Sequence, residues 1–484
     1  MVFEKPMRPA ALITASLATL ALSACASARK PDVQVPASFE MAQTSQTATS
    51  AQLETWWRQI DDPALTGLIE QALKASPDAR SASARLIEAQ ATSGTALIAF
   101  LPQGNGQGST KETRTTLDSG TAVNIPGYST KGTSTNSSGN LNVSWEMDLF
   151  GRIFAVARAA NGDSAAARFN YEASRASLAA NVADVYFQGQ GLAIQLEDAR
   201  ETVRIQTDLQ AVAEARVTHG LISRADGNKA RVDLAQAQSQ AAGLEAEFQA
   251  TRRTLLVLVG RGLEAGSSLP MTSRLAQVPE VPATVPGEIL ARRPDVREAK
   301  ARIESQAGRL TYAELAFFPT FTLTPGIGLS KSQQTGYQSS TRFWSIGGTV
   351  SQPVLSIPRL LTDLKSQKAR TEQAVIAYEK AVQTAYGEAD SALVRFAADQ
   401  RRVALLSEGE AQARQASEAA RIRYGAGLDD LQTTLAAELS WRAARSQMTA
   451  AQVQALRRSV QTYKALGGGW PASSLSTDKK ARAS

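Results

Sequence analysis

Apolar residues recur at intervals of three and four through two long stretches of the chain that contain no proline. The first stretch lies between Pro126 and Pro270 and the second between Pro358 and Pro471, and both are rich in Ala, Gln, Glu, Arg and Leu. These residues favour helix, whereas proline costs a helix interior about 3 kcal/mol, so each stretch is predicted to be a long helical hairpin. An unbroken helix from Arg152 to Thr218 would reach about 100 Å.

A different pattern, the alternation of apolar and polar residues, precedes each helical stretch. It is clear at 320–329, where Phe, Leu, Pro and Ile alternate with Thr and Gly, and at 141–149. About ten residues of this kind are typical of a strand in a transmembrane β-barrel, although a half-buried hairpin of a soluble protein alternates in the same way. Glycines occupy the alternate positions after Gln103, so the register of that strand stays open.

The two halves of the chain repeat each other. Residues Ser76–Arg85 match Arg293–Arg302, and Ala99–Pro102 match Ala316–Pro319, at an offset of 217 residues. The first β-hairpin is ten residues longer than the second, and after it the offset is 207. The segments matched at that offset begin at Val143, Tyr171, Gly220 and Ala237 in the first half and at Val350, Tyr378, Gly427 and Ala444 in the second. A duplication therefore underlies the chain.

Each repeat is predicted to contain a helix, a β-hairpin, a very long helix, a tight turn and a return helix. The expected division is a signal peptide at 1–24, a lipid-anchored tether at 25–51, the first repeat at 52–261, a proline-rich linker at 262–287, the second repeat at 288–467 and a disordered tail at 468–484. The β-hairpins are expected at about 100–149 and 318–357, and the α-hairpins at about 150–261 and 358–467.

The predicted fold class is mainly α, with a small transmembrane β-barrel portion. Two hairpins supply four strands, and a barrel in lipid must pair every edge, so one chain cannot close a barrel alone. Two copies would give eight strands with a filled interior, whereas three would give twelve strands and a lumen. The pattern therefore predicts an oligomer, and a homotrimer is the smallest one with an open lumen; its six long hairpins could close a hollow helical barrel below the strands.

The only cysteine, Cys25, directly follows a basic start and an apolar run that ends in Leu-Ser-Ala. This arrangement is typical of a secretory signal peptide, and Leu-Ser-Ala-Cys resembles the bacterial lipobox, in which the cysteine carries acyl chains. The alternative is a conventional signal peptide that happens to contain a cysteine. The residue after the cysteine is Ala26 and not the aspartate that retains such lipoproteins in the inner membrane. The resemblance therefore implies that the protein is anchored to lipid of the outer membrane.

Composition argues against catalysis and against nucleic-acid binding. The net charge of +7 is mild for 484 residues, and the charges are interspersed along the helices, as on solvated helix faces. The single histidine, His219, has no second histidine or cysteine with which to form a metal site. No nucleophile elbow or phosphate loop is present in the sequence, so we expect no enzyme activity and no cofactor other than the lipid on Cys25.

The chain resembles the outer-membrane factor family, the TolC-like ducts of tripartite export machines, and in particular the lipoprotein branch of the resistance-nodulation-division efflux systems. The stretches that carry the resemblance begin at Trp56, Val143, Val285, Arg216 and Arg423. The resemblance implies a trimer with a twelve-stranded barrel on a twelve-helix periplasmic tunnel. It also implies that the tunnel docks on a periplasmic adaptor, which joins it to an inner-membrane pump, and that the duct is passive.

The resemblance also assigns roles to the two turns between the long helices. It implies adaptor docking for residues at equivalent places in both turns, namely Arg216, Gly220, Leu221, Arg423, Gly427 and Leu428. Glycine there is equally explained by the turn alone, since a reversal between helices needs a left-handed residue. Asp429 and Asp430 follow only the second turn. The resemblance suggests a periplasmic gate formed with Arg421, Arg423 and Tyr424, whereas helix capping explains the same aspartates.

Two other functions remain open on the sequence. One is a duct of type I protein secretion, and the other is a lipid-anchored coiled-coil protein with a structural or adhesive role. The lipobox favours efflux over secretion, because secretion ducts of the family mostly lack it. Sustained heptads are absent from the sequence, which argues against the coiled coil. The exported substrate and the partner pump cannot be predicted.

Overall fold

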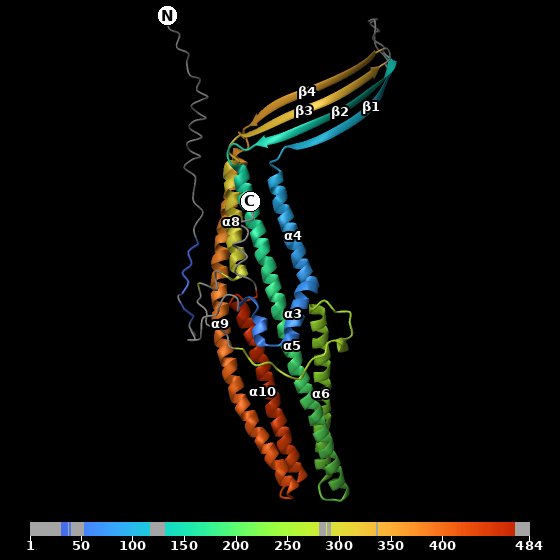
Figure 1. The fold of residues 1–484 in the computed structure, drawn as a ribbon, viewed down its shortest axis with the longest axis vertical. Helices are drawn as coiled ribbons and strands as arrows, with labels where there is room; N and C mark the ends of the chain where they lie inside the picture. Colours follow the sequence, from blue (N-terminus) through green and yellow to red (C-terminus); the bar gives the residue numbers. More distant parts are fainter. Residues whose placement is uncertain are drawn as a thin grey trace. The chain divides into compact units, whose positions relative to one another are not determined.

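The computed structural model describes residues 31–36, 38–39, 53–116, 131–279, 287, 292–334 and 337–469. The predicted signal peptide, Cys25 and the tail beyond residue 469 lie outside the described residues. The described chain forms two compact units. The first unit consists of Thr92–Gly162 and Arg302–Glu379, and the second of Val33–Ala91, Asp163–Ala301 and the chain from Lys380 onward. Both halves of the sequence thus contribute to both units (Figure 1).

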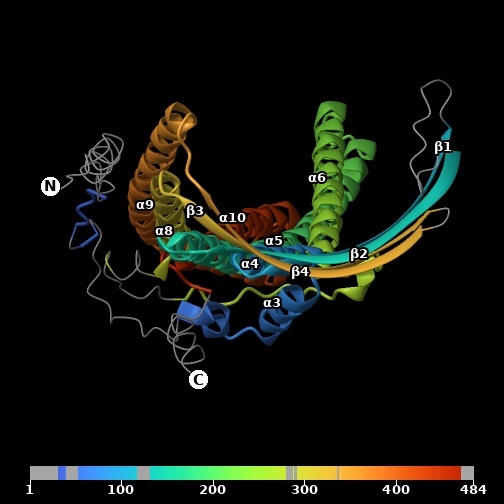
Figure 2. The same ribbon diagram turned by 90° about the horizontal axis from the view of Figure 1, so that it is seen from above.

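A four-stranded antiparallel sheet forms much of the first unit (Figures 1 and 2). Its strands are β1 (Gln103–Thr116), β2 (Lys131–Met147), β3 (Thr320–Gln334) and β4 (Tyr337–Ser351). They lie in the order β1-β2-β3-β4, so β2 of the first repeat pairs with β3 of the second. The two predicted hairpins therefore join into one continuous sheet.

The pairing places the apolar residues of three strands on one face of the sheet. Leu141 of β2 pairs with Ile327 of β3, which in turn pairs with Trp344 of β4. Because directly opposite residues point to the same face, these side chains form a row across the strands. Ile327 is 59% exposed and Trp344 is 77% exposed, so the apolar face lies open in the single chain.

The glycines of β1 also lie on the apolar face, and the register that the sequence left open is now defined. Gly104 pairs with Val143, and Gly106 pairs with Leu141. A Cβ atom built on Gly104 would lie 3.3 Å from Cγ2 of Val143. A side chain at position 104 would therefore press on Val143 of the neighbouring strand.

The junction between β2 and the first long helix is held by Asp148. Its Oδ1 accepts hydrogen bonds from the backbone N–H groups of Gly151 and Arg152, each 2.8 Å long, and its Oδ2 accepts one of 2.7 Å from Ile153. These N–H groups have no partner within the helix, so the carboxylate satisfies them. The Arg152 guanidinium then donates to the carbonyl oxygens of Leu315 and Phe318, at 3.0 Å and 2.9 Å.

Equal helix lengths reproduce the two offsets of the sequence repeat. Helices α4 (Pro77–Ile98) and α8 (Pro294–Leu315) have 22 residues each and begin 217 positions apart. Helices α6 (Arg224–Leu258) and α10 (Leu431–Ala465) have 35 residues each and begin 207 positions apart. The longest helices are α5 (Arg152–Thr218), with the predicted bounds, and α9 (Ile357–Gly425). None of the helices in the described ranges combines the length and the apolar character that crossing a membrane requires.

The largest apolar core lies in the second unit, where short elements pack on the long helices. The short 3-10 helix η1 (Trp56–Ile60) and α3 (Pro63–Ala75) contribute to it, with residues of α5, α6 and α10. Trp56 is 1% exposed and stacks on Tyr463 of α10, with ring centroids 5.7 Å apart. A second 3-10 turn, η2 (Gly266–Ser268), follows α6. The core thus packs α5, α6 and α10 against one another at a distance from the turns that join the long helices.

Candidate functional site

The first helical turn is built around Gly220, which has a left-handed backbone with φ of +69°. Its N–H donates to the carbonyl oxygen of Val217 at 3.0 Å, and the N–H of Leu221 donates to that of Arg216 at 2.8 Å. This pair of bonds is the Schellman motif, which satisfies the last carbonyl groups of α5. Glycine adopts the left-handed conformation without the cost that a Cβ would add.

The second turn repeats this geometry at the end of α9. Gly427 has φ of +74°, its N–H donates to the carbonyl oxygen of Tyr424 at 2.9 Å, and the N–H of Leu428 donates to that of Arg423 at 2.9 Å. Each predicted residue of the first turn therefore has a counterpart in the second with the same hydrogen bonds. Both turns lie at the same end of the second unit (Figure 1).

Leucine side chains project from both turns into solvent. Leu221 and Leu428 are each 71% exposed. The two turns are also linked within one chain, since the Arg216 guanidinium donates to Oε1 of Gln432, in the first turn of α10, at 3.3 Å. The predicted tip residues thus form two equivalent surfaces, each presenting one leucine.

The return helices begin with side-chain caps. Ser223 and Asp226 form a reciprocal capping box at the start of α6. At the start of α10, Oδ1 of Asp430 accepts a hydrogen bond of 2.7 Å from the N–H of Thr433. Hydrogen bonds from Thr433, first from its backbone, hold the pKa of Asp430 below its ordinary value. Asp430 therefore has the capping role that the sequence allowed.

Asp429 is placed differently from its neighbour. Its Oδ1 lies 2.9 Å from Nη2 of Arg423, and its side chain is 16% exposed, against 61% for that of Arg423. Arg421 and Tyr424 are exposed, and within the described residues neither forms a side-chain hydrogen bond or ion pair. The geometry thus distinguishes the two aspartates: Asp430 is bound to the backbone of α10, and Asp429 is bound to a side chain of the turn.

Acidification is expected to weaken the start of α10. A carboxylate whose pKa is lowered by folding contributes stability above its unfolded pKa, about 3.9 for aspartate, and loses that contribution as the pH falls through the folded value. The protection factors of the amides of Thr433 and Thr434, taken against the intrinsic exchange rate at each pH, should therefore fall below about pH 4. In Asp430→Ala, exchange should be fast already at neutral pH and should lose this acid-dependent step. An acid-dependent step that persists in the variant would contradict this assignment.

A buried cluster of charges joins α5 to α10 above the turns. The Asp198 side chain is 5% exposed; its Oδ1 lies 3.3 Å from Nη1 of Arg442, and its Oδ2 lies 3.4 Å from Nε of Arg445. Arg442 also contacts Oε1 of Glu438 at 3.0 Å. Burial raises the pKa of Asp198 above its ordinary value, because it outweighs the opposing effect of the arginines. The sequence showed charges at helical spacing on each helix, but not that they meet.

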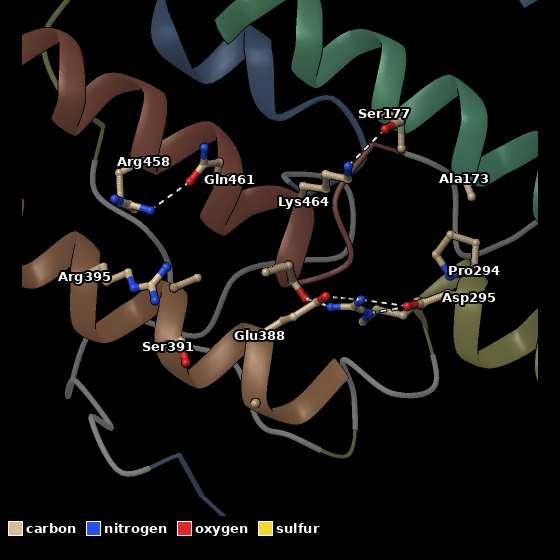
Figure 3. Close-up of a pocket in the computed structure, with 15 residues that line it drawn as sticks. Ala173, Ser177, Pro294, Asp295, Glu388, Ser391, Arg395, Arg458, Gln461 and Lys464 are labelled. Atoms are coloured by element: carbon tan, nitrogen blue, oxygen red, sulfur yellow. Dashed lines mark hydrogen bonds and ion pairs between the residues drawn. The ribbon is translucent and has the colours of Figure 1, made fainter. Parts of the chain in front are cut away.

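A cavity of about 650 Å³ lies where α8 begins, between α5, α9 and α10 (Figure 3). Arg293, 8% exposed, crosses its wall and contacts Oδ2 of Asp295 and Oε2 of Glu388, both at 2.6 Å. It also donates to the carbonyl oxygen of Ala465, the last residue of α10, at 3.2 Å. The arginine thus ties the start of α8 to α9 and to the end of α10, a role that sequence reasoning did not assign.

The family model described as outer membrane efflux protein matches the chain in two segments, residues 68–261 and 285–468. The segments begin 217 residues apart and end 207 residues apart, so they reproduce both offsets of the repeat. Together they cover well over half of the 484 residues.

Individual relatives match over nearly the whole chain. The pyoverdine export outer membrane protein OpmQ of Pseudomonas putida is 30% identical over 94% of this chain and 97% of its own length. The cation efflux system protein CusC of Escherichia coli O6:H1 is 28% identical over 96% of this chain and 100% of its own. The solved structure of the outer-membrane channel OprN is 27% identical, covers 92% of this chain and 99% of its own, and superposes with a TM-score of 0.74.

Proposed function

Because the chain belongs to the family of outer membrane efflux proteins, we propose that three copies of it assemble into the exit duct of a tripartite efflux system. The protein is an outer-membrane efflux channel and not an enzyme. In the proposed assembly, twelve strands form the barrel in the membrane and the long helices form a tunnel that reaches into the periplasm. Transport through such a duct is passive, and energy comes from a pump in the inner membrane.

The sheet is the observation that carries this proposal. In the described chain β1 and β4 each pair with only one other strand, so each leaves one edge free. Lipid offers no hydrogen bonds, and a sheet can span it only when every edge is paired. Pairing of β4 with β1 of the next copy removes the edges, and three copies give twelve strands around an open lumen. The apolar face then meets lipid and the polar face lines the lumen.

The two helical turns are proposed to dock a periplasmic membrane-fusion adaptor, which connects the duct to a resistance-nodulation-division pump. Support comes from the equivalent geometry of the turns and from the exposed Leu221 and Leu428. An apolar side chain held on a rigid turn is a suitable anchor for a pocket on a partner. In three copies, six such leucines would ring the mouth of the tunnel.

Acylation of Cys25 is proposed to anchor each copy to outer-membrane lipid. The support is the apolar run before this only cysteine. Each buried methylene of an acyl chain contributes about 0.8 kcal/mol, and one chain anchors a protein only marginally. The barrel and the acyl chains would therefore both contribute to holding the protein in the membrane.

Small molecules are the proposed cargo. The names of two relatives refer to pyoverdine export and to cation efflux, two cargoes with little in common. Most residues of the polar face are Ser, Thr, Asn, Gln and Gly, as in the row of Asn105, Asn142, Gly326 and Ser345, and such groups offer weak contacts to many solutes. The pump is therefore expected to select the substrate.

Cross-linking in the native envelope tests the proposed assembly. A photoreactive amino acid replaces Leu221 in one variant and Leu428 in another, and captured partners are identified by mass spectrometry. Both variants are expected to capture a periplasmic adaptor that co-purifies with a proton-driven pump, and a third variant labelled at Leu263, in the loop after α6, is expected not to. Capture of an ATP-driven type I transporter would replace efflux with secretion, and capture of no adaptor would overturn the docking proposal.

Asp429 is the proposed gate residue at the mouth of the tunnel. Its ion pair with Arg423 supports this assignment. Asp430 is the weaker candidate, because its carboxylate already caps α10 by accepting a hydrogen bond from the N–H of Thr433. Asp429→Asn is expected to raise the conductance of the closed duct several-fold in planar bilayers, because the charge-assisted contact is lost. Asp226→Asn on the first hairpin is the control and should leave the conductance unchanged. An unchanged conductance in Asp429→Asn would exclude the gate assignment.

A further inference from the structure

The apolar face of the sheet ends at a defined level on strands β3 and β4, and two cations mark this boundary. Leu329, the last apolar residue of the series on β3, pairs with Arg342 of β4. The next residue of β3 on the same face is Lys331, which pairs with Ser137 of β2 and with Ser340 of β4. Arg342 and Lys331 are therefore diagonal neighbours on one face, and the β carbons of such neighbours lie about 7 Å apart.

Neither cation is neutralised by a residue in the part of the chain that the structure describes. Arg342 and Lys331 are both exposed, and the described residues provide no ion pair or side-chain hydrogen bond to either. Glu112 of β1 shares their face, but it lies one row farther out and two strands away from Lys331, which corresponds to roughly 12 Å. Among the described residues of the single chain, both cations at this boundary thus lack a counter-charge.

The position of these cations follows from the size of the apolar face. From Phe321 to Leu329 the strand rises about 27 Å, which a tilt of about 45° reduces to about 20 Å, close to the apolar band of about 25 Å in outer-membrane barrels. The long helices continue from the other ends of β2 and β4, after Met147 and Ser351. In the proposed duct the helices lie in the periplasm, so the cations lie at the outer edge of the membrane.

Trp344 supports this depth. It lies two residues before Ile346 and two after Arg342 on the same face of β4, and it is 77% exposed. Tryptophan is enriched where the hydrocarbon of a membrane meets the headgroups, and long basic side chains extend from the same level toward the headgroup layer. The order of apolar residues, tryptophan and cations along β4 matches the order of layers across one leaflet.

We propose that Lys331 and Arg342 bind the phosphate groups of lipids in the outer leaflet, so that the duct holds a shell of anionic lipid around its outer rim. The proposal rests on the proposed function, which places this face against lipid. Two basic side chains about 7 Å apart can contact one phosphate together or two phosphates of the same headgroup. Six cations in three copies would bind several such lipids.

The test uses the full-length protein purified in detergent and titrated with lipid, with bound lipid counted by native mass spectrometry. The probes are diphosphoryl lipid A, monophosphoryl lipid A and phosphatidylcholine. The wild type is expected to prefer them in that order, and the preference should weaken in high salt. Each cation removed, in Lys331→Ala and Arg342→Ala, should lower the affinity for diphosphoryl lipid A about fivefold, the effect of one basic side chain near an anionic surface.

Lys111 provides a matched control. It pairs with Asn136, which pairs with Ser332, so it lies at nearly the same height on the opposite, polar face of the sheet. Lys111→Ala removes the same charge and should not change lipid binding, whereas exchanging the two cations, in Lys331→Arg with Arg342→Lys, should retain it. Equal binding of diphosphoryl lipid by the wild type and the double alanine variant would overturn the proposal, as would an equal loss in Lys111→Ala.

The proposed function is tested separately in the same samples. All variants are expected to remain trimeric and to conduct in planar bilayers. Normal conductance without a phosphate preference would refute the lipid site alone. Absence of trimers and of conductance in the wild type would instead refute the duct.

Discussion

Replacing Leu221 and Leu428 together with aspartate is expected to reduce export by about tenfold or more, while the protein stays folded and in the membrane. Both leucines are 71% exposed and lie on turns held by backbone hydrogen bonds, so the substitutions remove little internal packing. A charge introduced into an apolar contact costs far more than the contact itself contributed. Export is measured as survival and as efflux of a fluorescent substrate in cells that lack the native gene.

The matched control is Leu263→Asp, because this leucine is fully exposed in the loop after α6 and away from both turns. Export by the control should equal that of the wild type. Each single variant should be intermediate if the two turns bind equivalent sites. Full export by the double variant, at normal levels of protein in the membrane, would remove both leucines from the docking surface.

Replacing Arg442 with leucine is expected to destabilise the packing of α5 on α10 by about 3 kcal/mol or more, because it removes the partner of Glu438 and leaves the buried Asp198 with Arg445 alone. The Arg442 side chain is 14% exposed and lies between Asp198 and Glu438, whose side chains are 5% and 11% exposed. Adding Asp198→Asn and Glu438→Gln should restore much of the loss, since both buried carboxylates are then neutral and Arg445, which loses its partner Asp198, is 32% exposed and can be hydrated. Denaturant unfolding of the detergent-solubilised protein, followed by circular dichroism, measures the difference.

The control for this prediction is Arg204→Leu. Arg204 pairs with Glu201 and Asp208 on α5, but its side chain is 55% exposed. Exposed ion pairs contribute about 1 kcal/mol or less, so this variant should be nearly as stable as the wild type. Equal losses in Arg442→Leu and Arg204→Leu would show that burial does not determine the strength of the cluster.

The long helices and the fold class could be predicted from the sequence because their signals are local and repeated. Helix α5 has the bounds expected from the proline-free stretch, and the offsets of 217 and 207 recur as helices of equal length. Turns at Gly220 and Gly427 could also be predicted, since glycine commonly ends a helix in the left-handed conformation. Local chemistry was sufficient for these features.

Contacts between distant segments could not be predicted in this way. Alternation shows which face a residue occupies but not which residue lies opposite, so the register of β1 became clear only from the pairing of Gly104 with Val143. The charges that meet around Asp198 come from positions 244 residues apart in the case of Arg442. A single sequence also could not assign Asp429 and Asp430, because the two neighbours differ only in whether they reach the backbone of Thr433.

The equal lengths of α6 and α10 restrict how this protein can change size in evolution. A segment inserted into one helical hairpin alone would move one of the two turns away from the other, and a partner that binds both would lose half of its contacts. The helical hairpins can therefore lengthen only in both repeats at once, with the same number of residues added to α5, α6, α9 and α10. The β-hairpins are free of this constraint, and the ten-residue difference between the two halves of the chain falls there. A longer helical part would thus require coordinated changes in both repeats, whereas the loops between the paired strands can vary one at a time.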